Sequence, residues 1–127
     1  MSDPVHEAGM EVRRAVLGDA HVDRAIERTT PFTEPFQDFI TRCAWGSVWT
    51  REGLDRRTRS CITLAILTTL RAEDEIEMHV NAALRNGLTP EEIREVLLHT
   101  AVYAGVPAAN SAFAIAQRVL GDDPPAP

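Results

Sequence analysis

Apolar side chains recur at helical spacing along most of the chain, and this periodicity restricts its fold more than any other feature. No stretch alternates strictly between apolar and polar residues for more than a few positions, as a half-buried strand would. Glycine follows most of the periodic segments, as is common at helix ends. The sequence therefore predicts an all-α bundle of six or seven short helices. We expect them at residues 6–17, 22–28, 34–45, 55–71, 72–86, 89–104 and 107–120.

Two of the expected helices have distinctive sequences. The segment Thr89-Pro90-Glu91-Glu92 is a capping box with proline at the first helical position, the strongest local signal in the chain. Residues 61–70 are apolar or threonine on all sides, so we expect the helix that contains them to be central and buried on several faces. Its isoleucine and threonine content would also suit a strand, but its length favours a helix.

The 127 residues suit a single domain, residues 1–127, in which 122–127 form a disordered tail. A net charge of −6 argues against nucleic acid or an anionic membrane as the main partner. No apolar run approaches the roughly 20 residues that span a bilayer, and the first residues contain no apolar signal core. Cys43 and Cys61 match no zinc or redox motif. We expect both to be buried small hydrophobic residues of a cytoplasmic protein.

All 13 basic residues are arginine, and the chain contains no lysine. Schiff-base chemistry through a side-chain amine is therefore excluded, as is a phosphate-binding loop with its lysine. Arg56, Arg57 and Arg59 open the apolar helix, and a guanidinium matches the geometry of a carboxylate. We expect one or two of them to face inward as ligands for an acidic substrate. The alternative is a solvated helix start.

Glu75 and His79 form the best candidate pair for chemistry. They lie four residues apart and therefore one helical turn from each other, at the edge of an apolar stripe. A carboxylate beside an imidazole can orient the ring for proton transfer. The alternative is a surface pair that only stabilises the helix. A metal site would need three or four convergent ligands, so we expect none. The stripe consists of Ile76, Val80, Ala83 and Leu84.

The other candidates are histidines and aromatic residues. His21 lies between two short helices, where it could be a cap or a ligand, and His99 flanks an apolar face as a boundary residue. Trp45 and Trp49 are four residues apart and could form a pocket wall or simply part of the core. Tyr103 is a further candidate for such a wall.

The chain closely resembles 4-carboxymuconolactone decarboxylases of the protocatechuate branch of the β-ketoadipate pathway. The resemblance covers about residues 9–118 and includes loops and tryptophan positions that helix packing would not dictate. It implies an alkylhydroperoxidase D-like helical fold and a cofactor-free enzyme, usually a ring-shaped homohexamer. The stretches that carry it are GMEVRRAVLGDAHVDRA, ITRCAWGSVWTREGL, RRTRSCITLAIL, EIEMHVNAALRNGLTPEEIREVL and AVYAGVPAANSAFAIA.

The wider superfamily helps to locate the site. Alkylhydroperoxidase D-like proteins carry CxxCxxxH, and alignment on His79 places Ala72 and Glu75 at the two cysteine positions. Disulfide-based peroxidase chemistry is therefore excluded here. Many relatives also carry a glutamate on the preceding helix, where this chain has Ser60. Glu75 is thus the better carboxylate candidate.

The resemblance implies decarboxylation of 4-carboxymuconolactone to 3-oxoadipate enol-lactone through a dienolate. His79 would be the proton donor or the oxyanion partner, oriented by Glu75. The substrate carboxylates and an apolar wall would involve Arg56, Arg59, His21, Trp45, Trp49 and Tyr103. The alternatives are a related lactone or unsaturated-acid enzyme of the same fold, or a non-catalytic oligomerising helical module.

Overall fold

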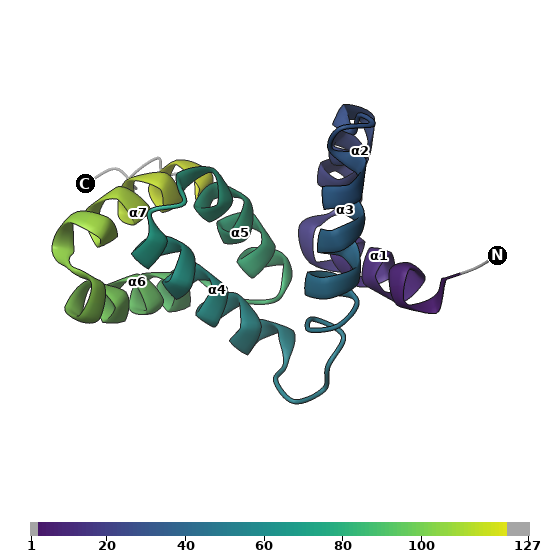
Figure 1. Ribbon diagram of the computed structural model, residues 1–127. Helices are drawn as coiled ribbons and strands as arrows, with labels where there is room; N and C mark the ends of the chain where they lie inside the picture. The colour runs from purple at the N-terminus through teal and green to yellow at the C-terminus, as the bar shows by residue number, and fades with distance from the viewer. Residues whose placement is uncertain (1–2, 122–127) are drawn as a thin grey trace. The chain divides into compact units, whose positions relative to one another are not determined.

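The computed structural model describes residues 3–121, and every regular element within that range is a helix (Figure 1). This confirms the predicted all-α class. The expected tail, residues 122–127, lies outside the described residues. The helices are α1 (Pro4–Leu17), α2 (Asp19–Arg28), α3 (Glu34–Ile40), the π-helical η1 (Thr41–Trp45), α4 (Arg56–Leu70), α5 (Glu73–Arg85), α6 (Pro90–Ala104) and α7 (Val106–Val119).

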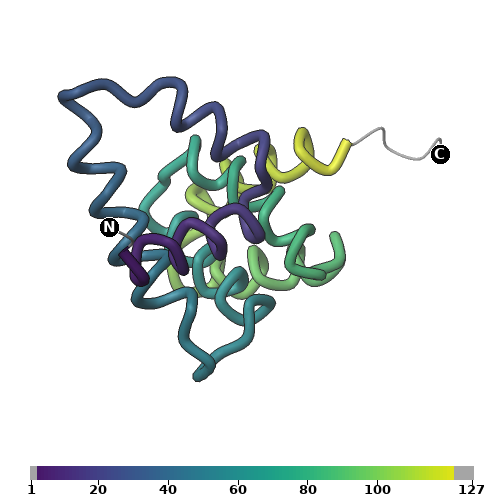
Figure 2. Tube along the Cα trace, turned by 90° about the vertical axis from the view of Figure 1, so that its right-hand side faces the viewer, coloured from purple at the N-terminus to yellow at the C-terminus, as the bar shows by residue number. Residues whose placement is uncertain are grey.

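The chain divides into two compact units after Arg56, and each is described by itself. The organisation of residues 1–127 as a single domain stays a prediction. Figure 2 follows the path of the chain through α1, α2 and α3 and then through α4 to α7.

The first unit is built where α1 packs against η1. Gly9 and Gly46 lie at this contact. A Cβ atom on either would collide with backbone atoms of the other helix, so the close approach requires glycine at both positions. The core beside it consists of Val12, Val16, Leu17, Val22 and Trp45.

The second unit packs α5 and α6 against α7 around one apolar core. The apolar stripe that the sequence places on α5 faces this core: Ile76, Val80 and Ala83 are buried and Leu84 is half-buried. The capping box at Thr89 is also confirmed. The buried residues of the core are Leu64, Ile76, Val80, Ala83, Leu88, Ile93, Leu97, Ala112, Ile115 and Ala116.

The expectation that α4 is buried on several faces is wrong for the single chain. Its buried residues recur every four positions and so form one stripe. The opposite face is open, with Ile62, Ile66 and Leu70 exposed to 44%, 52% and 69%. An apolar helix buries only the surface that neighbouring helices cover. Within one chain, the other helices cover one side of α4. The buried stripe is Ser60, Leu64 and Thr68.

The expectation that both cysteines are buried is also wrong. Cys61 is half-buried and Cys43 is exposed. Cys43 lies between Thr41 and Trp45, both of which are buried. Residues two positions away on a helix point to the opposite side, so the side chain of Cys43 is directed outward. None of the helices within residues 3–121 combines the length and apolarity needed to cross a membrane.

Candidate active site

Glu75 and His79 both lie on α5, one turn apart, but in different environments. The imidazole of His79 is only 8% exposed and belongs to the buried side of the helix. Glu75 is exposed in the acidic first turn of the helix. The two residues therefore cannot contribute equally to catalysis, because His79 lies where water is largely excluded and Glu75 lies in solvent.

A partly buried polar contact lies on the same face of α5 as His79. The side-chain amide of Asn86 donates a hydrogen bond to the Ser60 hydroxyl, 2.8 Å away on α4. Ser60 is almost fully buried. Asn86 follows His79 by seven residues, close to two helical turns, so both point from one side of the helix. His79 is therefore directed toward the side of α5 on which Ser60 of α4 lies.

Arg57 ties the start of α4 to the connection between α5 and α6. Its guanidinium donates to the carbonyl oxygen of Gly87 and, over 2.5 Å, to the carboxylate of Glu92. Glu92 also accepts the backbone N–H of Thr89 in the capping box. The hydrogen bond from Thr89 and then the one from Arg57 lower the pKa of Glu92. Within the arginine cluster at the start of α4, Arg57 thus has a structural role: it holds this helix to the connection between α5 and α6.

The other two arginines of that cluster differ in exposure. Arg56 is exposed at the first position of α4, and Arg59 is half-buried one turn later. Both remain candidates for binding an acidic ligand.

Two aromatic pairs involve predicted site residues. In the first unit the rings of Trp45 and Trp49 lie 5.1 Å apart at 36°, and Trp45 is buried. In the second unit the ring of Tyr103 lies 5.3 Å from that of His99. Tyr103 is 82% exposed, so within the single chain it does not wall a closed pocket.

His21 is half-buried near the start of α2, in strongly positive surroundings. Its pKa is lowered first by burial and then by the charges of Arg24, Arg13 and Arg28. The sequence proposed His21 as a ligand, and this positive field suits an anionic one.

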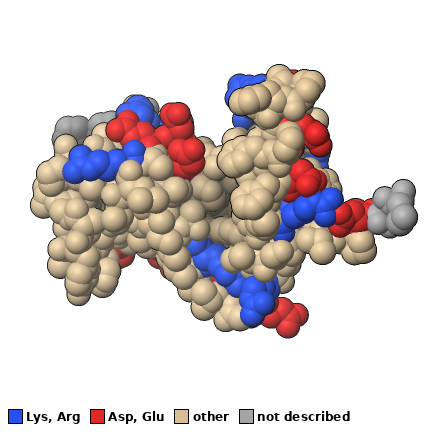
Figure 3. All heavy atoms as spheres, viewed as in Figure 1, with Lys and Arg blue, Asp and Glu red and all other residues tan. Residues whose placement is uncertain are grey.

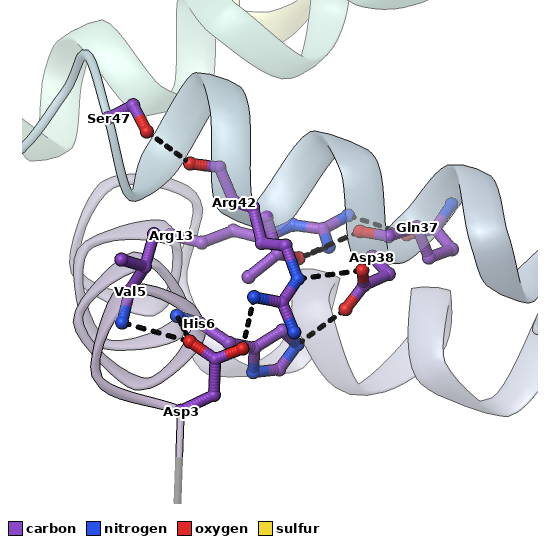
Figure 4. Close-up of polar contacts among 9 residues, drawn as sticks. Asp3, Val5, His6, Arg13, Gln37, Asp38, Arg42 and Ser47 are labelled. Atoms are coloured by element: carbon purple, nitrogen blue, oxygen red, sulfur yellow. Dashed lines mark hydrogen bonds and ion pairs between the residues drawn. The ribbon is translucent and has the colours of Figure 1, made fainter.

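Sequence reasoning missed one residue of this region, the buried Arg13. It is 6% exposed, and its guanidinium donates to the Thr41 hydroxyl at 3.2 Å and to the Gln37 amide oxygen at 3.0 Å (Figure 4). Burial, and next the charge of Arg14, lower the pKa of Arg13. The sequence did contain a signal for this burial: Arg13 follows Gly9 by four residues and therefore falls on the packed face of α1.

The predicted site residues divide between the two units. His21, Trp45, Trp49 and Arg56 belong to the first, and Arg59, Glu75, His79 and Tyr103 to the second. Within residues 3–121 no group of three or more His, Cys, Asp or Glu side chains could hold a metal ion.

The sequence matches the model of the carboxymuconolactone decarboxylase family over residues 34–118. The chain belongs to this family. A 4-carboxymuconolactone decarboxylase of Acinetobacter baylyi is 48% identical over 117 residues, which cover 92% of this chain and 87% of that protein. A nitrosuccinic acid decarboxylase of Metarhizium robertsii is 44% identical over 116 residues, 91% of this chain and 81% of that protein.

A further carboxymuconolactone decarboxylase, from Pseudomonas putida, is 61% identical over 41 residues, which cover 32% of this chain and 85% of that sequence. Family membership confirms the resemblance seen in the sequence and, with it, the all-α alkylhydroperoxidase D-like fold. The first two relatives also match residues beyond the family model, because their alignments cover over nine-tenths of the chain.

Proposed function

We propose that this protein is a carboxy-lyase that decarboxylates 4-carboxymuconolactone to 3-oxoadipate enol-lactone in protocatechuate catabolism. The observation that carries the proposal is the 48% identity to a 4-carboxymuconolactone decarboxylase along 92% of the chain. The relative named for nitrosuccinic acid is a decarboxylase too, which supports the reaction type independently of the substrate.

The substrate itself provides the electron sink for this reaction. Loss of CO2 from the ring γ-carbon leaves an electron pair that is conjugated with the lactone carbonyl, so the intermediate is a dienolate. The chemistry needs neither a side-chain amine nor a cofactor, which agrees with a chain that has no lysine. Two tasks remain for the protein: it must stabilise charge on the lactone oxygen and deliver a proton to carbon.

His79 is our candidate for one of these two tasks. Its imidazole is buried on α5, and a site with little water strengthens both a hydrogen bond to an oxyanion and a directed proton transfer. The hydrogen bond between Asn86 and Ser60 supports α5 on the same side. Glu75, in solvent, would act through the orientation and the charge of His79 and not by contact with the substrate.

The carboxylates of the substrate require arginine or histidine, because lysine is absent. Arg56 and Arg59 at the start of α4, together with His21, are the proposed ligands. The departing carboxylate should lie in less polar surroundings, since an arginine there would stabilise the ground state. Trp45, Trp49 and Tyr103 are the residues proposed for that wall.

Oligomerisation is part of the proposal, with the hexamer of the family as the expected state. Beyond the basic residues at the start of α4, the surface over this helix is largely uncharged in Figure 3. It includes a shallow apolar hollow. On α6 the neighbouring apolar side chains are exposed too, and exposed apolar area of this kind is typical of subunit contacts. The hollow is lined by Ala65, Ile66, Thr69 and Leu70, and the exposed side chains of α6 are Leu98, Val102 and Tyr103.

The test is turnover of 4-carboxymuconolactone by the purified chain, followed by its ultraviolet absorbance and by CO2 release. We expect saturable kinetics and one CO2 for each enol-lactone formed. Nitrosuccinic acid serves as the comparison substrate. Exclusive turnover of nitrosuccinic acid would keep the reaction type and replace the substrate. Turnover of neither compound would contradict the proposal and leave the two alternatives, an enzyme for another lactone or unsaturated acid and a non-catalytic helical module.

A further inference from the structure

Three arginines of the first unit can be compared, and only one of them is buried. Arg14 and Arg42 are each neutralised by two carboxylates, as Figure 4 shows for Arg42. Among residues 3–121 Arg13 has no such partner: its two hydrogen bonds go to neutral oxygens of Thr41 and Gln37. The carboxylate partners are Asp19 and Asp23 for Arg14, and Asp3 and Asp38 for Arg42.

The charge of Arg13 is therefore uncompensated among residues 3–121. Its Nε–H is buried without a hydrogen-bond acceptor, and none of the ion pairs in the described residues includes Arg13. Buried charges in proteins are normally paired, because an unpaired one carries a large desolvation penalty. A buried cation that holds only neutral acceptors is suited to an anion supplied from outside the chain.

The next helix presents further positive charge of the same kind. His21, Arg24 and Arg28 are spaced by three and four residues, so they share one face of α2, which we call the basic face. The aspartates of α2 lie on the opposite face, where Asp19 and Asp23 bind Arg14. Glu27 lies between these two faces. None of the ion pairs among residues 3–121 joins a carboxylate to the basic face.

Electrostatic coupling links Arg13 to the basic face. Burial, and then the charges of Arg24, Arg13 and Arg28, disfavour the protonated form of His21 and lower its pKa. A bound anion would reverse this field. Arg24 and Arg28 are exposed, His21 is half-buried and Arg13 is buried, so the charges that act on His21 come from both solvent and the interior.

We propose that Arg13 and the basic face of α2 form a carboxylate-binding site that takes one carboxylate of a dicarboxylic substrate. Arg13 provides the buried charge, His21 a hydrogen bond, and Arg24 and Arg28 the attractive field at the entrance. That the bound ligand is the substrate rests on the proposed function. That the site binds a carboxylate does not depend on it. Arg13 is thus a further substrate-binding residue, in addition to the arginines proposed on α4.

The test uses the full chain and succinate as a dicarboxylate probe, with affinity measured by isothermal titration calorimetry at low salt. Arg13→Gln should weaken succinate binding about tenfold or more, as expected for the loss of hydrogen bonds from a charged group. Arg14→Gln is the matched control: it removes the same charge one residue away, from an arginine that already has two carboxylates, and should change the Kd less than about threefold. A folded Arg13→Gln protein with the Kd of the wild type would overturn the proposal.

A second variant is needed because Arg13 also joins α1 to α3 and η1. Arg24→Gln/Arg28→Gln changes two exposed side chains and should leave folding intact. It should raise the Kd several-fold at low salt, and this difference should shrink as salt is added. An affinity equal to that of the wild type at low salt would overturn the site even if Arg13→Gln cannot be purified.

Kinetics separate this site from the proposed function. If the wild type turns over 4-carboxymuconolactone, Arg24→Gln/Arg28→Gln should raise KM and leave kcat nearly unchanged. If the wild type shows no turnover but binds succinate through Arg13, the carboxylate site stands and the proposed function fails. If turnover is normal and neither variant changes KM or Kd, the function stands and the site fails.

Discussion

The different environments of His79 and Glu75 lead to a quantitative prediction. His79→Asn removes a buried imidazole and should lower kcat at least about 10²-fold, the usual loss when a general acid is removed. Glu75→Gln removes a charge that lies in solvent one helical turn away, about 6 Å at the Cβ atoms. At the dielectric constant of water such a charge contributes about 0.7 kcal/mol, or roughly threefold in rate.

The assay compares kcat and KM for 4-carboxymuconolactone in the wild type and the two variants, after circular dichroism has shown that all three are helical. Urea unfolding should show little change for Glu75→Gln, because its side chain is exposed. A Glu75→Gln protein as slow as His79→Asn would refute the reasoning and place the carboxylate in direct contact with the reacting groups. Near-normal turnover by folded His79→Asn would remove His79 from the mechanism.

Four further predictions concern binding, stability and assembly. Arg59→Ala should mainly raise KM in steady-state kinetics, and an unchanged KM would exclude Arg59 from substrate binding. Thr89→Ala should lower the free energy of unfolding in urea by about 1 kcal/mol, because the capping box is lost, and wild-type stability would contradict this. The pKa of Glu92 is lowered in the folded state, so its contribution to stability is present above the ordinary pKa of 4.5 and is lost as the pH falls through the lower pKa of the folded protein. Because Arg57 is one cause of this shift, the free energy of unfolding in urea should depend less on pH in Arg57→Gln than in the wild type. Ile66→Arg places charge on the open face of α4 and should reduce the assembly to smaller species in size-exclusion chromatography with light scattering, whereas an unchanged mass would move the subunit contact elsewhere.

Local sequence signals proved sufficient for most of the secondary structure. The capping box at Thr89 and the glycine at position 87 mark their helix ends without help from distant residues: Gly87 has a φ of 96°, a conformation that favours glycine. The stripe on α5 was recognisable for the same reason, since a helical period is a local property. The exposure of Cys43 could not be predicted this way, because it depends on the π-helical turn, which directs this side chain outward.

The candidate site depends on both levels. The sequence by itself determined the all-α class, the residues that could carry the chemistry, and the reliance on arginine for positive charge. Spacing alone could not separate His79 from Glu75, because two residues one turn apart share a face of the helix while the packing of the other helices decides which is covered. Tertiary structure likewise showed that Arg57 joins α4 to the connection between α5 and α6. It also showed that Arg13 is a buried cation whose hydrogen-bond partners among residues 3–121 are neutral. Partners distant in sequence decide such roles, since charge neutralisation and burial depend on which groups meet in space.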